Sequence, residues 1–253
     1  MSRQKSIRFA ESKVMDNIVE IGKPGYLSKA GTWNAEFFQN EKPIVLEVAC
    51  GKGEYTVGLA RAFPGKNFIG MDIKGSRIYV GAKEAITEGI SNAAFLRGKI
   101  ENLRTFFGWR EVSEIWITFP DPRPKDRDEK RRLTFRRFLS LYQHILHPDG
   151  ILHLKTDNRP LMDYTIASVQ EFGGEILAQT YDLYHSEWKD EHLGIQTYFE
   201  QKFTAKGFSI NYLRFRLPVL EVPSGPVPPI FLRGEPLSED AMLLAGRSIR
   251  SIG

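Results

Sequence analysis

The middle of the chain alternates short apolar runs with helical patterns, and this alternation restricts the possible folds more than any other feature. Apolar or β-branched runs occur at 44–48, 67–73, 93–98, 113–119 and 150–156. Helical patterns lie at 53–63, 75–88, 101–107, 133–146 and 159–172. Strands that alternate with helices indicate βαβ units. The sequence therefore predicts an α/β fold whose mostly parallel sheet has helices on both faces.

The pattern changes after residue 174. Two longer strand-like runs, at 175–184 and 208–217, are separated by a polar stretch. We expect them to form an antiparallel pair that closes one edge of the sheet, which gives seven strands in all. The segment "HPDG" at 147–150 predicts a turn before the fifth strand.

The length and the composition shifts predict one large domain with appendages. We place the central domain at residues 40–217. Residues 1–39 form a basic N-terminal extension and cap. Four of its basic residues fit either an arm or a disordered segment: Arg3, Lys5, Arg8 and Lys13. Residues 218–253 form a proline-rich C-terminal extension that we expect to be extended.

The single cysteine, Cys50, excludes an internal disulfide and fits a reducing compartment. No apolar core follows the basic N-terminus, and no stretch approaches the roughly 20 apolar residues that a membrane span needs. We therefore expect a cytoplasmic protein without a membrane partner. The net charge of +4 is only weak support for a polyanionic partner.

A glycine-rich turn follows the first predicted strand, in the segment "LEVACGKGE" at 46–54. Gly51 and Gly53 allow the backbone to approach a ligand closely, and the following helix offers free N–H groups. Glu47 lies at the end of the first strand and Asp72 at the end of the second. Acidic residues there are placed to accept hydrogen bonds from ribose hydroxyls. The turn therefore predicts a nucleoside-binding site.

Two kinds of cofactor fit such a turn. A nicotinamide dinucleotide prefers G-x-G-x-x-G without acidic residues, because the turn then holds a pyrophosphate. Here Glu47 precedes the turn and Glu54 follows it. Their negative charge disfavours pyrophosphate and suits a ligand with an ammonium and a sulfonium group, S-adenosylmethionine. A dinucleotide oxidoreductase remains the rival interpretation.

The segment "FPDPRPK" at 119–125 ends the fourth predicted strand with a carboxylate, Asp121. In an open α/β sheet, ligands bind beyond the carboxyl ends of the strands, so Asp121 should share an edge with Glu47 and Asp72. The neighbouring prolines restrict φ and stiffen the loop. We predict that Asp121 orients a substrate beside the cofactor.

A basic run, "KDRDEKRRLTFRR", occupies residues 125–137. Acidic residues dilute it, and a solvated loop is the plain alternative. Beside a cofactor pocket, however, such residues favour contacts with nucleic-acid phosphates. The candidates are Arg127, Lys130, Arg131 and Arg132.

Several segments share one resemblance: "LEVACGKGEYTVGLA", "NFIGMDIKGSR", "IWITFPDPRPKDRDEKRRL", "LHPDGILHLKTDN" and "TYFEQKF". In order and spacing they resemble bacterial tRNA (guanine-N7-)-methyltransferases, over about residues 40 to 217. The resemblance implies a Rossmann-like class I methyltransferase. It also implies methyl transfer from S-adenosylmethionine to N7 of the variable-loop guanine in tRNA. The alternatives are a methyltransferase of another RNA or of a protein, and a non-catalytic RNA-binding module on the same fold.

The resemblance also implies roles for individual residues. Asp121 matches a catalytic residue that also lies at the cofactor. The other cofactor-binding positions are Glu47, Gly51, Gly53, Asp72, Lys99 and Ile100. The substrate-binding positions are Lys125, Asp157, Thr197, Tyr198, Phe199 and Glu200. No metal is implied, and the resemblance leaves both a monomer and a homodimer open.

Four residues depart from the family pattern. Ala49 stands where a glycine is usual, which a methyl group permits if φ is negative there. Lys99 stands where an acidic residue is common, so we expect only its backbone to serve. Arg123 replaces the tryptophan of P-D-P-W, and Phe199 replaces the tyrosine of T-x-Y-E.

Overall fold

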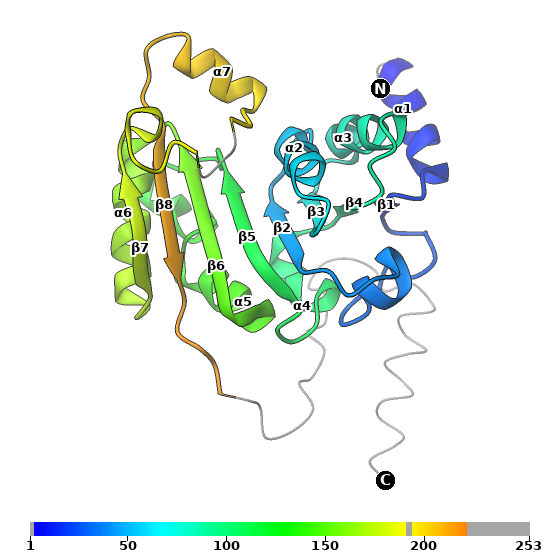
Figure 1. Ribbon diagram of the computed structural model, residues 1–253, viewed down its shortest axis with the longest axis horizontal. Helices are drawn as coiled ribbons and strands as arrows, with labels where there is room; N and C mark the ends of the chain where they lie inside the picture. The colour runs from blue at the N-terminus through cyan, green and yellow to red at the C-terminus, as the bar shows by residue number, and fades with distance from the viewer. Residues whose placement is uncertain (1–2, 191–193, 222–253) are drawn as a thin grey trace.

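The computed structural model describes residues 3–190 and 194–221, which contain one mixed sheet with helices on both sides (Figure 1). The sheet has eight strands in these residues, in the order β1-β4-β3-β2-β5-β6-β8-β7. Their bounds are β1 Ile18–Val19, β2 Ile44–Val48, β3 Asn67–Asp72, β4 Ala93–Arg97, β5 Val112–Thr118, β6 Leu146–Thr156, β7 Glu175–Thr180 and β8 Asn211–Arg216. The helices are α1 Arg3–Val14, α2 Glu54–Ala62, α3 Gly75–Thr87, α4 Leu103–Phe106, α5 Arg136–Ile145, α6 Arg159–Glu171 and α7 Tyr198–Thr204.

The predicted architecture is confirmed. Strands β1 to β6 pair in parallel, and β8 is antiparallel to both β6 and β7. The antiparallel pair therefore closes one edge, with its later strand inserted next to β6. Besides the seven predicted strands, the sheet contains β1, a two-residue strand from the N-terminal extension that pairs with β4.

Alternate residues of each strand point to opposite faces, and this divides the core into two layers. Leu46 of β2 belongs to the layer that also contains buried residues of α4, α5 and α6, whereas its neighbour Val45 belongs to the layer that contains those of α2 and α3. Both layers consist of buried aliphatic and aromatic side chains. The strands therefore have two buried faces in the middle of the sheet, which explains their nearly continuous apolar sequences.

One sequence prediction about the backbone is wrong. The segment 147–150 is not a free turn, because β6 already begins at Leu146. Val112 of β5 pairs with Leu146, but Glu114 pairs with Ile151, so the ladder shifts register there. The proline and glycine of "HPDG" are accommodated by this bulge, since a bulge leaves residues outside the ladder.

The N-terminal extension packs on the central domain. Arg8 of α1 donates a hydrogen bond to the carbonyl of Ser76 at 3.3 Å, and Glu11 accepts one from the Tyr79 hydroxyl. Trp33, in a π-helical turn at Trp33–Phe38, is fully buried, and its Nε1 donates to the Phe106 carbonyl at 2.7 Å. Residues before 40 thus contribute to the core.

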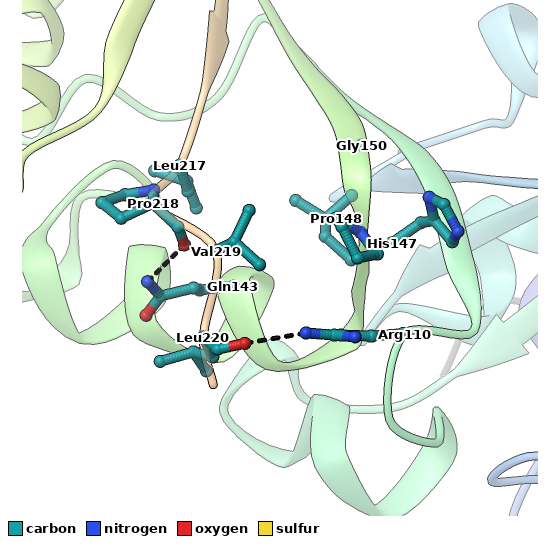
Figure 2. A pocket seen from close by; sticks show the side chains of 10 residues that line it. Arg110, Gln143, His147, Pro148, Gly150, Leu217, Pro218, Val219 and Leu220 are labelled. Atoms are coloured by element: carbon teal, nitrogen blue, oxygen red, sulfur yellow. Dashed lines mark hydrogen bonds between the residues drawn. The ribbon is translucent and has the colours of Figure 1, made fainter. Parts of the chain in front are cut away.

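After β8, the beginning of the C-terminal extension runs past α5 and the loop before β5. Gln143 donates to the carbonyl of Pro218 at 2.6 Å, and Arg110 donates to that of Leu220 at 2.7 Å (Figure 2). The rest of the predicted extension, residues 222–253, lies outside the described residues. No helix in the described part of the chain is long and apolar enough to cross a membrane.

Candidate active site

The predicted site residues follow successive parallel strands at one edge of the sheet. Because carboxyl ends of parallel strands meet at the same edge, the fold brings these positions together. Helix α7 lies above this edge (Figure 1). The residues that the strands deliver are Glu47 in β2, Asp72 at the end of β3, Lys99 and Ile100 after β4, Asp121 after β5 and Asp157 after β6.

The turn between β2 and α2 has a left-handed backbone. Gly51 has a φ of 59° and Gly53 a φ of 75°. A Cβ at Gly53 would lie 2.3 Å from Cε1 of Phe95, whereas a Cβ at Gly51 would meet nothing within 4 Å. Gly53 is therefore required by packing, and open space beside Gly51 allows a ligand to approach the backbone.

The expected backbone at Ala49 is wrong. Its φ is +56°, in the left-handed region that favours glycine. Ala49 therefore does not fit through a negative φ, and the turn holds this residue in a strained conformation.

Ala49→Gly should raise the free energy of unfolding by about 1 kcal/mol, because glycine adopts this backbone without a Cβ penalty. Urea unfolding measures the change. The matched control is Ala62→Gly at the exposed end of α2, where the same substitution should lower stability by about 0.5–1 kcal/mol. A loss of stability in both variants would show that the backbone at Ala49 is not strained.

Asp72 joins the turn to the next loop. Its side chain accepts hydrogen bonds from the Gly51 N–H at 3.0 Å and from the Lys74 N–H at 2.8 Å. The residue is 7% exposed. A carboxylate can accept about four hydrogen bonds, so Asp72 retains acceptor capacity for a ribose hydroxyl.

Glu47 lies beneath the turn and is 3% exposed. It accepts hydrogen bonds from the Thr56 N–H at 2.9 Å and from the hydroxyls of Thr56 and Thr118, both at 2.5 Å. Burial raises the pKa of Glu47 to about 7, although these hydrogen bonds oppose the shift. Glu47 thus connects the start of α2 to the end of β5 through these hydrogen bonds.

Asp121 stands in an exposed, tightly folded loop. Its side chain is 62% exposed and lies 3.1 Å from Nε of Arg123, which also donates its backbone N–H to Asp121 at 3.3 Å. Phe119 and Arg123 have positive φ values of 49° and 47°. The residue that replaces the family tryptophan therefore places a positive charge against Asp121.

The basic run after this loop is largely solvent-facing. Lys125 precedes a 3-10 turn at Asp126–Arg131. The exposed basic members are Lys125, Arg127, Lys130, Arg131, Arg136 and Arg137. Arg132 differs, because its guanidinium carbon lies 4.2 Å from the centre of the Tyr164 ring and its Nε donates to the Arg123 carbonyl.

The four residues at 197–200 have different environments. Thr197 and Glu200 form a capping box at the start of α7. Tyr198 and Phe199 are exposed, whereas Glu200 is fully buried. Its Oε1 lies 2.7 Å from Nζ of Lys155 and accepts the Tyr184 hydroxyl at 2.5 Å. Burial lowers the pKa of Lys155, and the Glu200 carboxylate opposes this shift.

Sequence reasoning missed the partners of the buried carboxylates: Thr56, Thr118, Lys155 and Tyr184. A usable signal existed for Lys155, which interrupts the apolar strand "GILHLKT". A charge inside a buried strand requires a buried partner. The threonines carried no such signal, because threonine is common in strands and at helix starts.

Residues 41–213 match a family model described as "Putative methyltransferase". The tRNA (guanine-N(7)-)-methyltransferase of Christiangramia forsetii is 45% identical over 221 residues, which cover 85% of this chain and 99% of that protein. The protein of the same name from Porphyromonas gingivalis is 53% identical over 188 residues, or 74% of this chain and 76% of that protein. The chain belongs to the tRNA (guanine-N(7)-)-methyltransferase family.

Solved structures agree with the methyltransferase fold. The 16S rRNA methyltransferase KamB aligns with a TM-score of 0.57 at 16% identity, covering 73% of this chain and 92% of that one. A 16S rRNA (adenine(1408)-N(1))-methyltransferase with cosubstrate SAM, from Catenulisporales acidiphilia, aligns with a TM-score of 0.51 at 15% identity, covering 76% and 92%. At these identities the likeness concerns the fold alone.

Proposed function

We propose that this methyltransferase transfers a methyl group from S-adenosylmethionine to N7 of the variable-loop guanine in tRNA. The observation that carries the proposal is the 45% identity that spans 99% of a tRNA (guanine-N(7)-)-methyltransferase. We assign the chemistry to residues 40–217, with residues 1–39 and 218–253 as flanking extensions.

The residues at the turn fit S-adenosylmethionine. Gly51 offers open backbone and Asp72 offers acceptor capacity, while the negative charge around the turn suits a cationic ligand. The Glu47 side chain holds the start of α2, and Lys99 and Ile100 follow β4 at the same edge of the sheet. When bound, the cofactor supplies an electrophilic methyl group on a sulfonium sulfur.

The nucleophile needs no general base. Guanine N7 carries a lone pair and no proton, so nothing has to be removed before it attacks the methyl group. Catalysis then rests on holding N7 in line with that group. Orientation of this kind supplies about 7–11 kcal/mol at best.

Asp121 is the catalytic residue in this proposal. Its carboxylate accepts hydrogen bonds from guanine N1–H and N2–H₂ and stabilises the positive charge that methylation places on the base. Arg123 competes for the same carboxylate, since its Nε already lies 3.1 Å away. Binding of the base therefore includes displacement of this exposed ion pair, which is a small cost.

The exposed basic residues after Asp121 should bind tRNA phosphates. Changing Arg127 and Lys130 together to glutamine should weaken tRNA binding and reduce the slope of log K against log salt by about 1–2, because each contact releases counterions. Fluorescence titration at several salt concentrations measures the slope. The control is Lys66→Gln. Lys66 precedes β3 at the amino ends of the parallel strands, so this change should leave the salt slope unchanged.

The function is tested with labelled S-adenosylmethionine and unmodified tRNA transcripts that carry guanine or adenine in the variable loop. Label should appear only on the guanine transcript. Equal label on both would refute the site of methylation. Salt-dependent tRNA binding without any transfer would support the non-catalytic RNA-binding alternative instead.

A further inference from the structure

Helix α7 and the residues before it span the cofactor turn. A Cβ on Gly58 of α2 would lie 2.7 Å from Cγ2 of Ile195, so this segment packs closely on α2. The Tyr198 N–H donates to Glu54 at 3.0 Å, and Nζ of Lys52 lies 5.1 Å from the centre of the Tyr198 ring. The segment thus contacts the turn, its helix and, through Glu200, the sheet.

Helix α7 has one buried side chain among the contacts that hold it in place. It has seven residues, which is too short for a stable isolated helix. Its buried residue is Glu200, while Tyr198 and Phe199 are 46% and 60% exposed. A helix anchored mainly through one buried side chain depends on the partners of that side chain for its position.

Those partners include Lys155 of β6, which is 0% exposed and forms a 2.7 Å ion pair with Glu200. The ammonium group also lies 5.0 Å from the centre of the buried Tyr55 ring of α2. The backbone carbonyl of Lys155 accepts the N–H of Phe119 at 2.8 Å, at the start of the Asp121 loop. One residue therefore contacts both α7 and the loop that carries Asp121.

We propose that Lys155 is a positioning residue, which fixes α7 over the cofactor turn through Glu200 so that Thr197, Tyr198 and Phe199 meet the tRNA in one arrangement. The inference rests on the proposed function, and it assigns Glu200 to anchoring rather than to direct contact with the base. A buried ion pair suits this role because its short-range geometry selects one register, whereas apolar contacts tolerate several.

The test compares Lys155→Met with the double variant Lys155→Met/Glu200→Gln. The single variant leaves a buried carboxylate unpaired and should lower the melting temperature. The double variant removes both charges and should recover most of that loss. In both variants, KM for tRNA should rise at least about tenfold while the Kd for S-adenosylmethionine changes less than about twofold, because the turn itself is intact.

Lys66→Met is the matched control, since it breaks the 2.8 Å pair with Glu114 away from the site edge and should leave KM unchanged. Recovery of KM together with the melting temperature in the double variant would show that the pair is only structural. If the single variant fails to fold, the double variant alone decides between these outcomes.

Hydrogen exchange separates this inference from the proposed function. In the double variant, amides of 198–204 should exchange at least about tenfold faster, while those of α6 at 159–171 should not change. Unchanged protection of α7 would refute the positioning role of Lys155, whatever the methylation activity of the variant. Wild-type protein that methylates no tRNA would overturn the proposed function and the claim about tRNA, even if the exchange result holds.

Discussion

Asp121→Asn should lower kcat/KM for tRNA methylation by about 10²–10³-fold. The amide keeps the shape of the side chain, but its NH₂ group opposes the donors of guanine and its neutrality removes the stabilisation of a cationic product. Because the Asp121 side chain is 62% exposed, the free energy of unfolding should stay within about 0.5 kcal/mol of the wild-type value. Single-turnover transfer of a labelled methyl group measures the effect.

A second carboxylate in the same loop region provides the control. Asp126 is exposed at the start of the following 3-10 turn, so Asp126→Asn makes the same change in charge nearby. It should alter kcat/KM by less than about threefold, through weak effects on exposed charges. Near-normal turnover in Asp121→Asn, or equal losses in the two variants, would remove Asp121 from the catalytic role.

Glu47→Gln should stabilise the fold increasingly as the pH rises. The folded-state pKa of Glu47 is raised from 4.5 to about 7, so folding favours the protonated carboxyl. The stability from that preference is fully present below pH 4.5 and is lost as the pH rises through about 7. The free energy of unfolding of the neutral variant should therefore equal the wild-type value near pH 4.5. It should exceed the wild-type value by up to about 3 kcal/mol at pH 8.

The amide can preserve the contacts of Glu47. Its oxygen accepts from the Thr56 N–H and hydroxyl, and its NH₂ group donates to the Thr118 hydroxyl. Urea unfolding of both proteins at pH 5, 6, 7 and 8 measures the difference. Exposed Glu41→Gln should show no such trend. A difference between Glu47→Gln and the wild type that does not change with pH would show that Glu47 titrates normally.

The fold was predictable because its local signals are strong. The run 44–48 is apolar or β-branched apart from Glu47, and it became a fully buried strand. The helix predicted at 159–172 begins after Asn158, whose side chain accepts the Leu161 N–H at 2.8 Å, and the observed helix ends one residue earlier. Local sequence and tertiary packing agree in these segments, so the pattern was sufficient.

The failures came from tertiary context. "HPDG" has the residues of a turn, but its neighbours Leu146 and Ile151 both pair with β5, so it becomes the unpaired bulge of one long strand. The backbone of Ala49 cannot be read from an alanine, because only the packed turn imposes the positive φ. Asp72 and Asp121 lie at the carboxyl edge of the sheet, as expected. The buried carboxylates are different, because their partners lie far away in the sequence. Glu47 accepts a hydrogen bond from Thr118, and Glu200 forms an ion pair with Lys155.

The departure at Arg123 shows the same limit. Its position beside Asp121 was clear from the spacing of "DPR", but the choice between a stacking surface and an ion pair depends on the backbone. The left-handed φ of Arg123 turns its side chain back onto Asp121, two residues earlier. The sequence predicted that a charge replaces the family tryptophan; the loop geometry determines what that charge contacts.

Methylation at N7 is tested most directly with two tRNA transcripts that differ only at the variable-loop guanine. One carries guanine, and the other carries 7-deazaguanine, which keeps N1–H and N2–H₂ but has a carbon in place of N7. We expect the second transcript to bind without receiving a methyl group, while the first is methylated. Equal methyl transfer to both transcripts would contradict this expectation.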